Sequence, residues 1–411
     1  MSASKSTEAH ATTAANTQTV SLSRPSEVSL AQLPPLALYV HLPWCVRKCP
    51  YCDFNSHEVG HDAALPEEAY VDALIADLEH ALPWIWGRRV SSIFFGGGTP
   101  SLFSARSLDR LLAAFRARIG ISPDAEITLE ANPGSVEAQK FRDYRQAGVN
   151  RLSLGIQSLD DAQLRVLGRI HTADEARRAI ATAQRIFDQM NLDVMLALPG
   201  QDVEGMQRML REVIGFGTPH LSAYQLTLEP NTVFQRYPPA DLPSHDIAAA
   251  VQECAQATLI AAGYEHYETS AFARPNMRCR HNLNYWQFGD YLGLGAGAHG
   301  KLSFPDRIER HARIAQPREY MPRALQHDSI LTYTRVRSED LPFEFMLNAL
   351  RLCEGVPLTL FRERTGLELT RIAQPLAQAE AQGLLERDHT HLRPTAHGQR
   401  FLNDLLTLFL P

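Results

Sequence analysis

Short apolar runs alternate with stretches of helical periodicity along the first half of the chain. The runs that have the length and composition of strands are 36–43, 90–95, 125–131, 151–157, 192–198 and 220–227. Between them, apolar residues recur every three or four positions at 67–85, 107–119, 136–147, 173–187 and 203–216, which predicts helices. Strands joined by helical crossovers predict a parallel sheet with right-handed connections. The pattern alone leaves open whether this sheet is flat and doubly wound or curved into a partial barrel.

Polar residues stand near the ends of most of these predicted strands. The second strand runs into the glycine run 96–98 and Thr99, and the third ends near Glu130. The fourth ends at Gln157, and the fifth carries Asp193 near its start. A polar residue inside an apolar strand is costly unless it finds a partner, so this recurrence predicts one shared polar cavity. In a barrel, the carboxyl ends of the strands are where the chemistry sits.

Three closely spaced cysteines, Cys45, Cys49 and Cys52, form the strongest chemical signal in the chain. A four-iron cluster is normally held by four thiolates, so three on one loop leave the fourth iron open to an outside ligand. A structural zinc site usually takes two pairs of ligands, whereas the remaining cysteines are isolated at Cys254, Cys279 and Cys353. A zinc ion completed by His41 or His57 is the alternative. Six cysteines in 411 residues do not suggest a disulfide framework.

The bulk composition narrows the class of protein. With 411 residues, of which 45% are hydrophobic, the chain can bury a large core and is expected to form more than one domain. A net charge of −6 argues against a general nucleic-acid binder. No apolar run approaches the roughly 18 residues that cross a bilayer. Residues 1–33 are rich in Ser, Thr and Ala, which predicts a disordered tail, and a reducing cytoplasm is the expected location.

The last part of the chain has the pattern of a separate small domain over 336–411, which leaves 34–335 as the core domain. Helices are predicted at 339–353, 358–365 and 370–382, followed by a hairpin of 384–387 and 390–392 and a final helix at 398–409. This order is typical of a winged-helix domain. The third helix carries Arg371 as its only cation and contains Pro375, so protein contact or a lid role is favoured over DNA binding.

The cysteine triad and the alternation of strands and helices resemble the radical S-adenosylmethionine (SAM) superfamily. The resemblance implies a partial (β/α)6 TIM-like barrel, a [4Fe–4S] cluster on the cysteines, and SAM bound to the open iron through its amine and carboxylate. It also implies SAM contacts from Tyr39, Gly97, Gly98, Thr99, Glu130, Gln157, Arg169 and Asp193. Carboxylates suit ribose hydroxyls and the ammonium, and a guanidinium suits the SAM carboxylate. Arg169 follows a predicted helix at 162–168, so a surface charge is the alternative for it.

Within that superfamily, the chain from residue 36 onward is similar to the oxygen-independent coproporphyrinogen III oxidase-like family. The resemblance is carried by Tyr-Val-His-Leu-Pro-Trp-Cys at 39–45, Gly-Ile-Gln-Ser at 155–158 and Gly-Leu-Gly-Ala-Gly-Ala-His at 293–299. This family is known for two functions. One is the oxidase, which decarboxylates two propionates of coproporphyrinogen III by radical SAM chemistry and forms protoporphyrinogen IX. The other is a haem chaperone.

Three features favour the chaperone branch. The oxidase has a further cysteine two residues after the triad, where this chain has Phe54, and the amino-terminal extension of the oxidase has no clear counterpart here. The segment 281–286 contains the His-Asn-x-x-Tyr-Trp motif that is associated with haem binding in the chaperones. The resemblance therefore implies a chaperone more than an enzyme, one that hands haem to acceptors such as membrane-associated respiratory proteins.

The haem-binding residues that this motif implies are His281, Asn282, Tyr285 and Trp286. An imidazole is a common axial ligand of haem iron, and adjacent aromatic rings can stack on the macrocycle. A Cys279 thiolate is an alternative iron ligand. A structural role is the other alternative, in which His281 and Trp286 only close the contact between the barrel and the C-terminal region.

Overall fold

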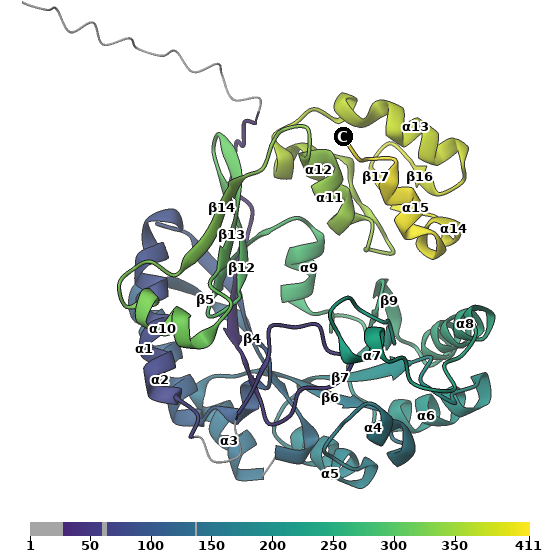
Figure 1. Ribbon diagram of the computed structural model, residues 1–411. Coiled ribbons are helices and arrows are strands. Elements are labelled where there is room, and N and C mark those ends of the chain that lie inside the picture. Colours follow the sequence, from purple (N-terminus) through teal and green to yellow (C-terminus); the bar gives the residue numbers. More distant parts are fainter. Residues whose placement is uncertain (1–27, 60–63, 136–137) are drawn as a thin grey trace, which may run out of the picture.

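The computed structural model describes residues 28–59, 64–135 and 138–411. Its largest element is a 12-stranded sheet in the order β14-β13-β12-β11-β1-β4-β5-β6-β7-β8-β10-β9 (Figure 1). The parallel strands predicted from the sequence form its centre: β1 (Leu36–Leu42), β4 (Arg89–Gly97), β5 (Gly120–Ala131), β6 (Arg151–Gln157), β7 (Gln189–Leu196) and β8 (His220–Gln225). All of the predicted strands are therefore confirmed.

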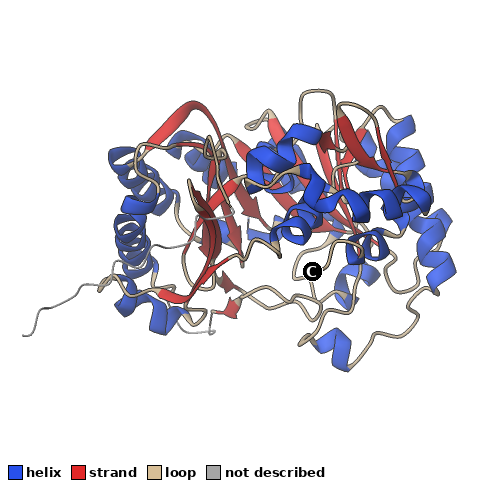
Figure 2. Ribbon diagram, turned by 90° about the horizontal axis from the view of Figure 1, so that it is seen from above, coloured by secondary structure: helices blue, strands red, loops and turns tan. Residues whose placement is uncertain are grey.

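Helices connect these strands as the periodicity predicts. They are α1 (Glu67–Ala81), α2 (Ala105–Arg118), α3 (Ala138–Ala147), α4 (Asp161–Val166), α5 (Ala173–Gln184) and α6 (Val203–Gly215). The predicted start of the third helix, Val136, lies outside the described residues. The helices follow an arc on the outside of the sheet (Figure 1), and the view from above shows the strands between two groups of helices (Figure 2). The sheet is thus a partial barrel and not a flat doubly wound sheet.

The sheet extends beyond its parallel centre on both sides. β11 (Asp290–Leu294) pairs in parallel with β1 and is followed by the antiparallel strands β12 (His299–Phe304), β13 (Arg307–Arg313) and β14 (Ile330–Arg335). On the other side, β8 pairs with β10 (Ala271–Ala273), which pairs with β9 (Glu265–Glu268). The helices of this region are α7 (Val233–Arg236), α8 (His245–Ala261), α9 (Arg280–Trp286) and α10 (Pro317–Ala324). Because β1 and β8 have these other partners, the barrel stays open.

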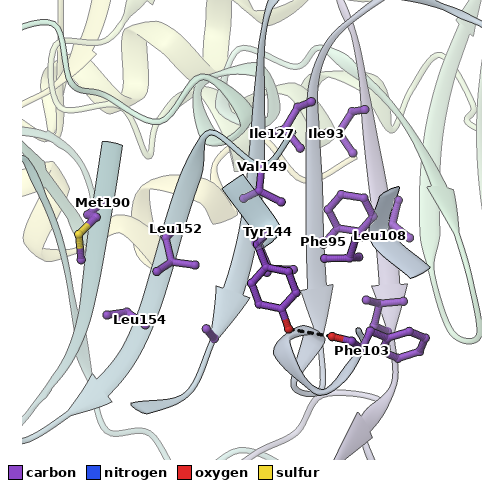
Figure 3. Packing of buried hydrophobic residues seen from close by; sticks show 14 of the residues in the cluster. Ile93, Phe95, Phe103, Leu108, Ile127, Tyr144, Val149, Leu152, Leu154 and Met190 are labelled. Atoms are coloured by element: carbon purple, nitrogen blue, oxygen red, sulfur yellow. Dashed lines mark hydrogen bonds between the residues drawn. The ribbon is translucent and has the colours of Figure 1, made fainter. Parts of the chain in front are cut away.

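Side chains alternate between the two faces of the sheet. One face packs in the apolar core beneath the helices, and the other lines the inside of the barrel. Ile93 and Phe95 of β4 pack in the main apolar core, where Tyr144 of α3 also lies and donates its hydroxyl to the main chain (Figure 3). Successive side chains of a strand point to opposite faces, so Ser92 and Phe94 face the inside. The helices therefore stabilise one face of the sheet and leave the other face free for polar groups.

The C-terminal part has the winged-helix order that the sequence predicts. Its elements are α11 (Leu341–Ala349), β15 (Val356–Pro357), α12 (Leu358–Thr365), α13 (Ala373–Ala381), β16 (Leu385–Arg387), β17 (His391–Pro394), α14 (Ala396–Arg400) and α15 (Leu402–Thr407). The predicted hairpin is present as β16 and β17, and β15 adds a third strand. Gly383 follows α13 with a φ of +67°, as expected of a glycine that ends a helix. The predicted last helix is two helices, because the backbone of Phe401 (φ −110°, ψ 43°) leaves the helical region.

The amino-terminal residues of the described chain pack against this C-terminal part. Residues 1–27 of the predicted tail lie outside the described residues, but 28–33 are described, and Val28 and Leu30 are buried in the C-terminal apolar cluster. Residues 28–33 are therefore ordered, contrary to the prediction. Phe288 and Ile308 of the core join the same cluster, so the division between 335 and 336 stays a prediction. Within the described ranges, we find no helix with the length and apolarity to span a membrane.

Candidate functional site

The ends of the parallel strands border a cavity of about 450 Å³. The loop that carries the cysteines forms one wall, and residues at the ends of β4 to β8 form the others. The predicted residues that line it are Cys45, Cys49, Cys52, Gly97, Gly98, Thr99, Glu130, Gln157, Arg169 and Asp193. Tyr39 is not among the lining residues, and its hydroxyl lies 3.0 Å from Nδ1 of His41. The structure thus brings the predicted cluster and SAM residues together, apart from Tyr39.

Each cysteine of the triad has a polar neighbour in the cavity wall, and that of Cys52 is Ser56, whose hydroxyl lies 4.0 Å from its Sγ. The Thr99 hydroxyl donates to Cys45 Sγ at 3.5 Å, and Arg169 Nη1 donates to Cys49 Sγ at 3.6 Å. Burial raises the pKa of the Cys45 and Cys52 thiols. Metal binding requires the thiolate form, so a bound metal would provide the positive charge that favours deprotonation in this buried place.

The histidines near the triad are already engaged, which disfavours the zinc alternative. His41 Nε2 lies 2.8 Å from the carbonyl oxygen of Asn55, and its Nδ1 faces the hydroxyl of Tyr39. His57 Nε2 lies 3.2 Å from Asn55 Oδ1. Across the described residues, no three His, Cys, Asp or Glu side chains are arranged to hold a single metal ion. In a cubane cluster each thiolate binds a different iron, so three cysteines without a histidine ligand suit the cluster better than zinc.

The glycine run at the end of β4 allows the cysteine loop to lie directly against the strand. A Cβ on Gly97, whose φ is +114°, would stand 2.6 Å from the imidazole ring of His41. A Cβ on Gly98 would stand 2.6 Å from the carbonyl oxygen of Trp44. The N–H of Gly98 donates to the Leu42 carbonyl at 2.9 Å, which holds the two segments together. These glycines therefore position the triad through close backbone approach.

Replacing Gly98 with alanine should destabilise the protein and disturb the cysteine loop. The added methyl group meets backbone atoms, which cannot move aside without shifting the loop, and we expect a loss of about 2–4 kcal/mol. The control is Gly215→Ala at the end of α6, where a Cβ meets nothing within 4 Å. Urea unfolding should show an unchanged or slightly higher midpoint for the control. Equal losses in both variants would contradict the packing argument.

Two carboxylates share the inner wall of the cavity. Glu130 Oε2 accepts from the N–H of Gly97 at 3.3 Å, and burial followed by the charge of Asp193 raises its pKa to about 8. Asp193 accepts from Ser153 Oγ at 3.1 Å and from Asn191 Nδ2 at 2.8 Å, and burial raises its pKa as well. Paired buried carboxylates are unfavourable without a cation. This pair therefore suits a ligand that carries an ammonium or hydroxyl donors.

Glu130→Gln is expected to stabilise the ligand-free protein while weakening SAM binding. The folded-state pKa of Glu130 lies above its ordinary value, so its stabilising contribution is complete below pH of about 4.5 and is lost as pH rises towards about 8. At pH 8 the free energy of unfolding of the variant should be about 1–2 kcal/mol higher than that of the unmodified protein. This is less than the pKa shift of Glu130 alone implies, because water that enters the cavity screens its charge. Urea unfolding of ligand-free protein at several pH values tests this, with the exposed Glu253→Gln as the control. A stability gain that is independent of pH would contradict the explanation.

Arg169 and Gln157 also line the cavity, and Arg169 lies beside the triad. Arg169 Nη2 donates to Asn132 Oδ1 at 2.5 Å and to the carbonyl oxygen of Gly155 at 2.8 Å. The alternative of a surface charge is therefore wrong for Arg169. Gln157 has a φ of +62°, which is uncommon for a residue other than glycine and is typical of functional sites.

Sequence reasoning missed several residues of this cavity. Asn132, Ser153 and Tyr51 line it, although none of them was predicted as a site residue. Asn132 stands two positions after Glu130 at the end of the predicted strand. Because side chains two positions apart on a strand point to the same face, the sequence could have placed Asn132 in the cavity. Tyr51 lies between two cysteines of the triad, where its proximity to the cluster was predictable from the sequence alone.

The residues of the haem motif lie on α9, outside the lining of the cysteine cavity. The Ser92 hydroxyl lies 3.0 Å from Nδ1 of His281, and the imidazole stacks on Phe94 with ring centres 5.0 Å apart. Nε2 of His281 is buried and has no hydrogen-bond partner. Tyr285 has its ring centre 5.1 Å from that of His281. One ring nitrogen of His281 is thus held by Ser92, and the other, Nε2, has no hydrogen-bond partner.

Trp286 of the motif faces the C-terminal part of the molecule. The guanidinium of Arg351 lies 4.4 Å from the ring centre of Trp286, and Trp286 packs against the C-terminal apolar cluster. Asn282 is partly exposed on the same helix. The contact between the barrel and the C-terminal part, suggested as an alternative role for this motif, is therefore present. It does not use the free nitrogen of His281.

Cys279 is a poor candidate for an iron ligand. Its side chain is fully buried, and its Sγ lies 3.4 Å from Glu126 Oε1. Burial raises the pKa of this thiol to about 12, although the neighbouring Arg151 acts in the opposite direction. A thiol that stays protonated and donates to a carboxylate does not offer a thiolate. Among the candidate iron ligands, His281 is the better fit.

Two family models match the chain. The radical SAM superfamily model covers residues 39–213, and the HemN C-terminal domain model covers residues 336–401. Among solved structures, coproporphyrinogen III oxidase (HemN) from Escherichia coli matches with a TM-score of 0.77 and 24% identity, over 92% of this chain and 90% of that one. At this identity the structural match supports the fold alone.

Curated relatives are more similar in sequence. The chain is 48% identical to the heme chaperone HemW of Escherichia coli (strain K12), over 93% of this chain and 100% of that protein. It is 46% identical to the heme chaperone HemW of Haemophilus influenzae, over 93% and 99% of the two chains. It is 37% identical to radical S-adenosyl methionine domain-containing protein 1, mitochondrial, of Bos taurus, over 91% and 87%.

Proposed function

Because the chain belongs to the heme chaperone HemW family of the radical SAM superfamily, we propose that it binds haem and passes it to acceptor proteins. Membership of the superfamily implies a [4Fe–4S] cluster and SAM. Membrane-associated respiratory proteins as acceptors, and the reducing cytoplasm as the place of transfer, are part of this proposal. The family agrees with the one expected from the cysteine triad and the motif on α9.

The observation that carries this proposal is the state of the His281 imidazole. A hydroxyl engages Nδ1, and Nε2 has no partner, which is how protein imidazoles are commonly oriented for a metal. Burial first, and Arg151 second, lower the pKa of His281 to about 3, so the ring is neutral at ordinary pH. Its side chain is only 4% exposed, so haem binding requires a movement of α9.

The cysteine cavity supplies the residues for the cluster and SAM. The three thiolates of the triad would each bind one iron, and the fourth iron would take SAM. Arg169 suits the SAM carboxylate, and Glu130 and Asp193 suit the ammonium and the ribose hydroxyls. When bound, the cluster supplies the electron that cleaves SAM in radical enzymes. The residues of this chain bind and orient SAM and enclose it in a buried polar wall.

The oxidase reaction is the alternative function, and the fold is compatible with it. Against it stands Phe54, which occupies the position of the additional cysteine in the oxidase pattern. Its side chain lines the cavity and is 58% exposed. A phenyl ring cannot replace a thiolate as a ligand or as a redox group.

The experiment that tests the proposal measures both activities on anaerobically reconstituted full-length protein. Haem is titrated while the Soret absorbance is followed, and a parallel anaerobic reaction contains SAM, a reductant and coproporphyrinogen III. We expect saturation near roughly one haem per chain, as one axial imidazole implies, and no consumption of coproporphyrinogen. Turnover of coproporphyrinogen with weak, unsaturable haem binding would overturn the proposal.

A further inference from the structure

A row of buried polar side chains joins the cysteine cavity to α9 through the inside of the barrel. It begins at Asp193, which accepts from Asn191 Nδ2 at 2.8 Å. Asn191 Oδ1 lies 2.6 Å from Nδ1 of His220, on the neighbouring strand β8. Nε2 of His220 lies 2.8 Å from the hydroxyl of Tyr267 on β9. The row thus crosses from β7 to β9, away from the cavity.

The row ends at the first turn of the haem-motif helix. The N–H of Cys279, directly before α9, donates to the Tyr267 hydroxyl at 3.4 Å. Glu126 of β5 holds the next residues, since it accepts from the N–H of Arg280 at 3.1 Å and from that of His281 at 3.0 Å. The start of α9 is therefore fixed to the barrel by the row and by one carboxylate.

All hydrogen bonds of the row have one consistent direction. Burial, and then Arg151, hold the pKa of His220 well below its usual range, so its ring has one donor and one acceptor nitrogen. Because Asn191 donates through Nδ2 to Asp193, its Oδ1 is the atom that faces Nδ1 of His220; Nε2 is therefore the acceptor nitrogen, and the Tyr267 hydroxyl donates to it. Nδ1 then donates to Asn191, whose amide group donates to Asp193. Every group donates towards the carboxylate in the cavity.

The members of the row are deeply buried. Asn191 also donates to Ser153 Oγ at 2.8 Å and accepts from Ser222 Oγ at 3.0 Å, whereas both ring nitrogens of His220 are used within the row. Asn191, His220 and Tyr267 are at most 2% exposed. A buried polar group that loses its partner costs free energy, so a change at one end has to be accommodated along the row. A ligand whose hydroxyl or ammonium groups bind the Asp193 carboxylate competes with the hydrogen bond from Asn191 Nδ2. Weakening that bond loosens the row and lowers the free-energy cost of moving α9.

We propose that this row, which we call the lumen chain (Asp193, Asn191, His220, Tyr267 and Cys279), couples SAM binding in the cavity to haem binding at α9. The inference rests on the proposed function. His220 and Tyr267 are positioning residues, since they act through their neighbours. SAM strengthens haem binding, because α9 has to move before His281 can reach haem. By linkage, haem strengthens SAM binding by the same factor.

The test compares haem titrations of reconstituted full-length protein with and without SAM. SAM should lower the Kd for haem by at least about fivefold in the unmodified protein. In Tyr267→Phe, which lacks the hydroxyl shared by His220 and Cys279, the effect should fall below about twofold. The control is Tyr144→Phe, because that buried hydroxyl also bonds to the main chain but lies outside the lumen chain. It should keep the full effect of SAM.

A second measurement needs no haem. SAM alone should speed hydrogen exchange of the backbone amides of residues 280–286 in the unmodified protein and in Tyr144→Phe, but not in Tyr267→Phe. If the unmodified protein binds no haem, the proposed function fails, and the exchange result alone decides the coupling. If haem binds but SAM leaves its Kd unchanged, or changes it equally in Tyr267→Phe, the coupling is overturned.

Discussion

Replacing His281 with alanine is expected to abolish saturable haem binding. The variant removes the imidazole whose Nε2 has no other partner. We expect the Kd for haem to rise at least about 100-fold, or about 2.7 kcal/mol. Any remaining binding should be unsaturable and should have an altered Soret spectrum. The measurement is a haem titration of anaerobically reconstituted protein.

The matched control for this variant is His311→Ala. His311 is 3% exposed, and its Nδ1 has no hydrogen-bond partner, while its Nε2 lies 3.6 Å from Glu309 Oε2; it lies on β13 outside the motif. Each substitution removes a buried ring and should cost about 1–3 kcal/mol of folding stability. Urea unfolding should therefore show similar losses for the two variants. If His311→Ala weakens haem binding as much as His281→Ala, the loss comes from folding and the ligand role is wrong.

Replacing Cys49 with serine is expected to remove both the iron–sulfur cluster and SAM binding. A hydroxyl is a poor iron ligand, and two remaining thiolates do not hold a cubane cluster. SAM then loses the open iron and keeps only the weaker contacts of the cavity wall. Iron and sulfide content, the brown absorption of the reconstituted protein, and SAM binding by equilibrium dialysis measure the effect. We expect at least about a tenfold loss of SAM affinity.

The control for the cluster is Cys254→Ser. Cys254 lies on α8 outside the cavity, and its Sγ accepts from Gln207 Nε2 at 2.9 Å. This variant should keep the cluster and SAM. Because His281 lies outside the cavity, Cys49→Ser should still bind haem, with the affinity of the unmodified protein without SAM. Complete loss of haem from Cys49→Ser, with its folding intact, would show that haem depends on the cluster and would contradict two separate sites.

The elements that the sequence predicted best are those with strong local signals. The parallel strands are short apolar runs bounded by turn residues, and the helices between them have regular apolar spacing. The outer strands were missed, since β13 (Arg307–Arg313) carries many charged residues and does not have the pattern of an apolar run, although its partners β12 and β14 are its neighbours in sequence. The order of Val28 and Leu30 was missed for a different reason, because it depends on contact with the C-terminal part, which is distant in sequence.

Arg169 illustrates where local signals were not sufficient. Its position after a short helix fitted a surface charge as well as a ligand. The turn at Gly168 determines where the Arg169 side chain lies. Gly168 has a φ of +68°, and a Cβ on it would stand 2.7 Å from Pro50 in the cysteine loop. The turn therefore packs against that loop and directs the guanidinium into the cavity. Such a contact joins residues more than a hundred positions apart, so no short pattern encodes it.

The sequence by itself determined the chemical groups of this protein. The spacing of the triad, the glycine run and the motif on α9 lie within short segments, where residue order alone is informative. Only the tertiary structure decided that His281 is buried away from the cavity with an unpartnered nitrogen, and that a row of hydrogen bonds connects the start of α9 to Asp193. The reason is physical: strand pairing brings β7, β8 and β9 together, and only then can their buried polar groups satisfy one another.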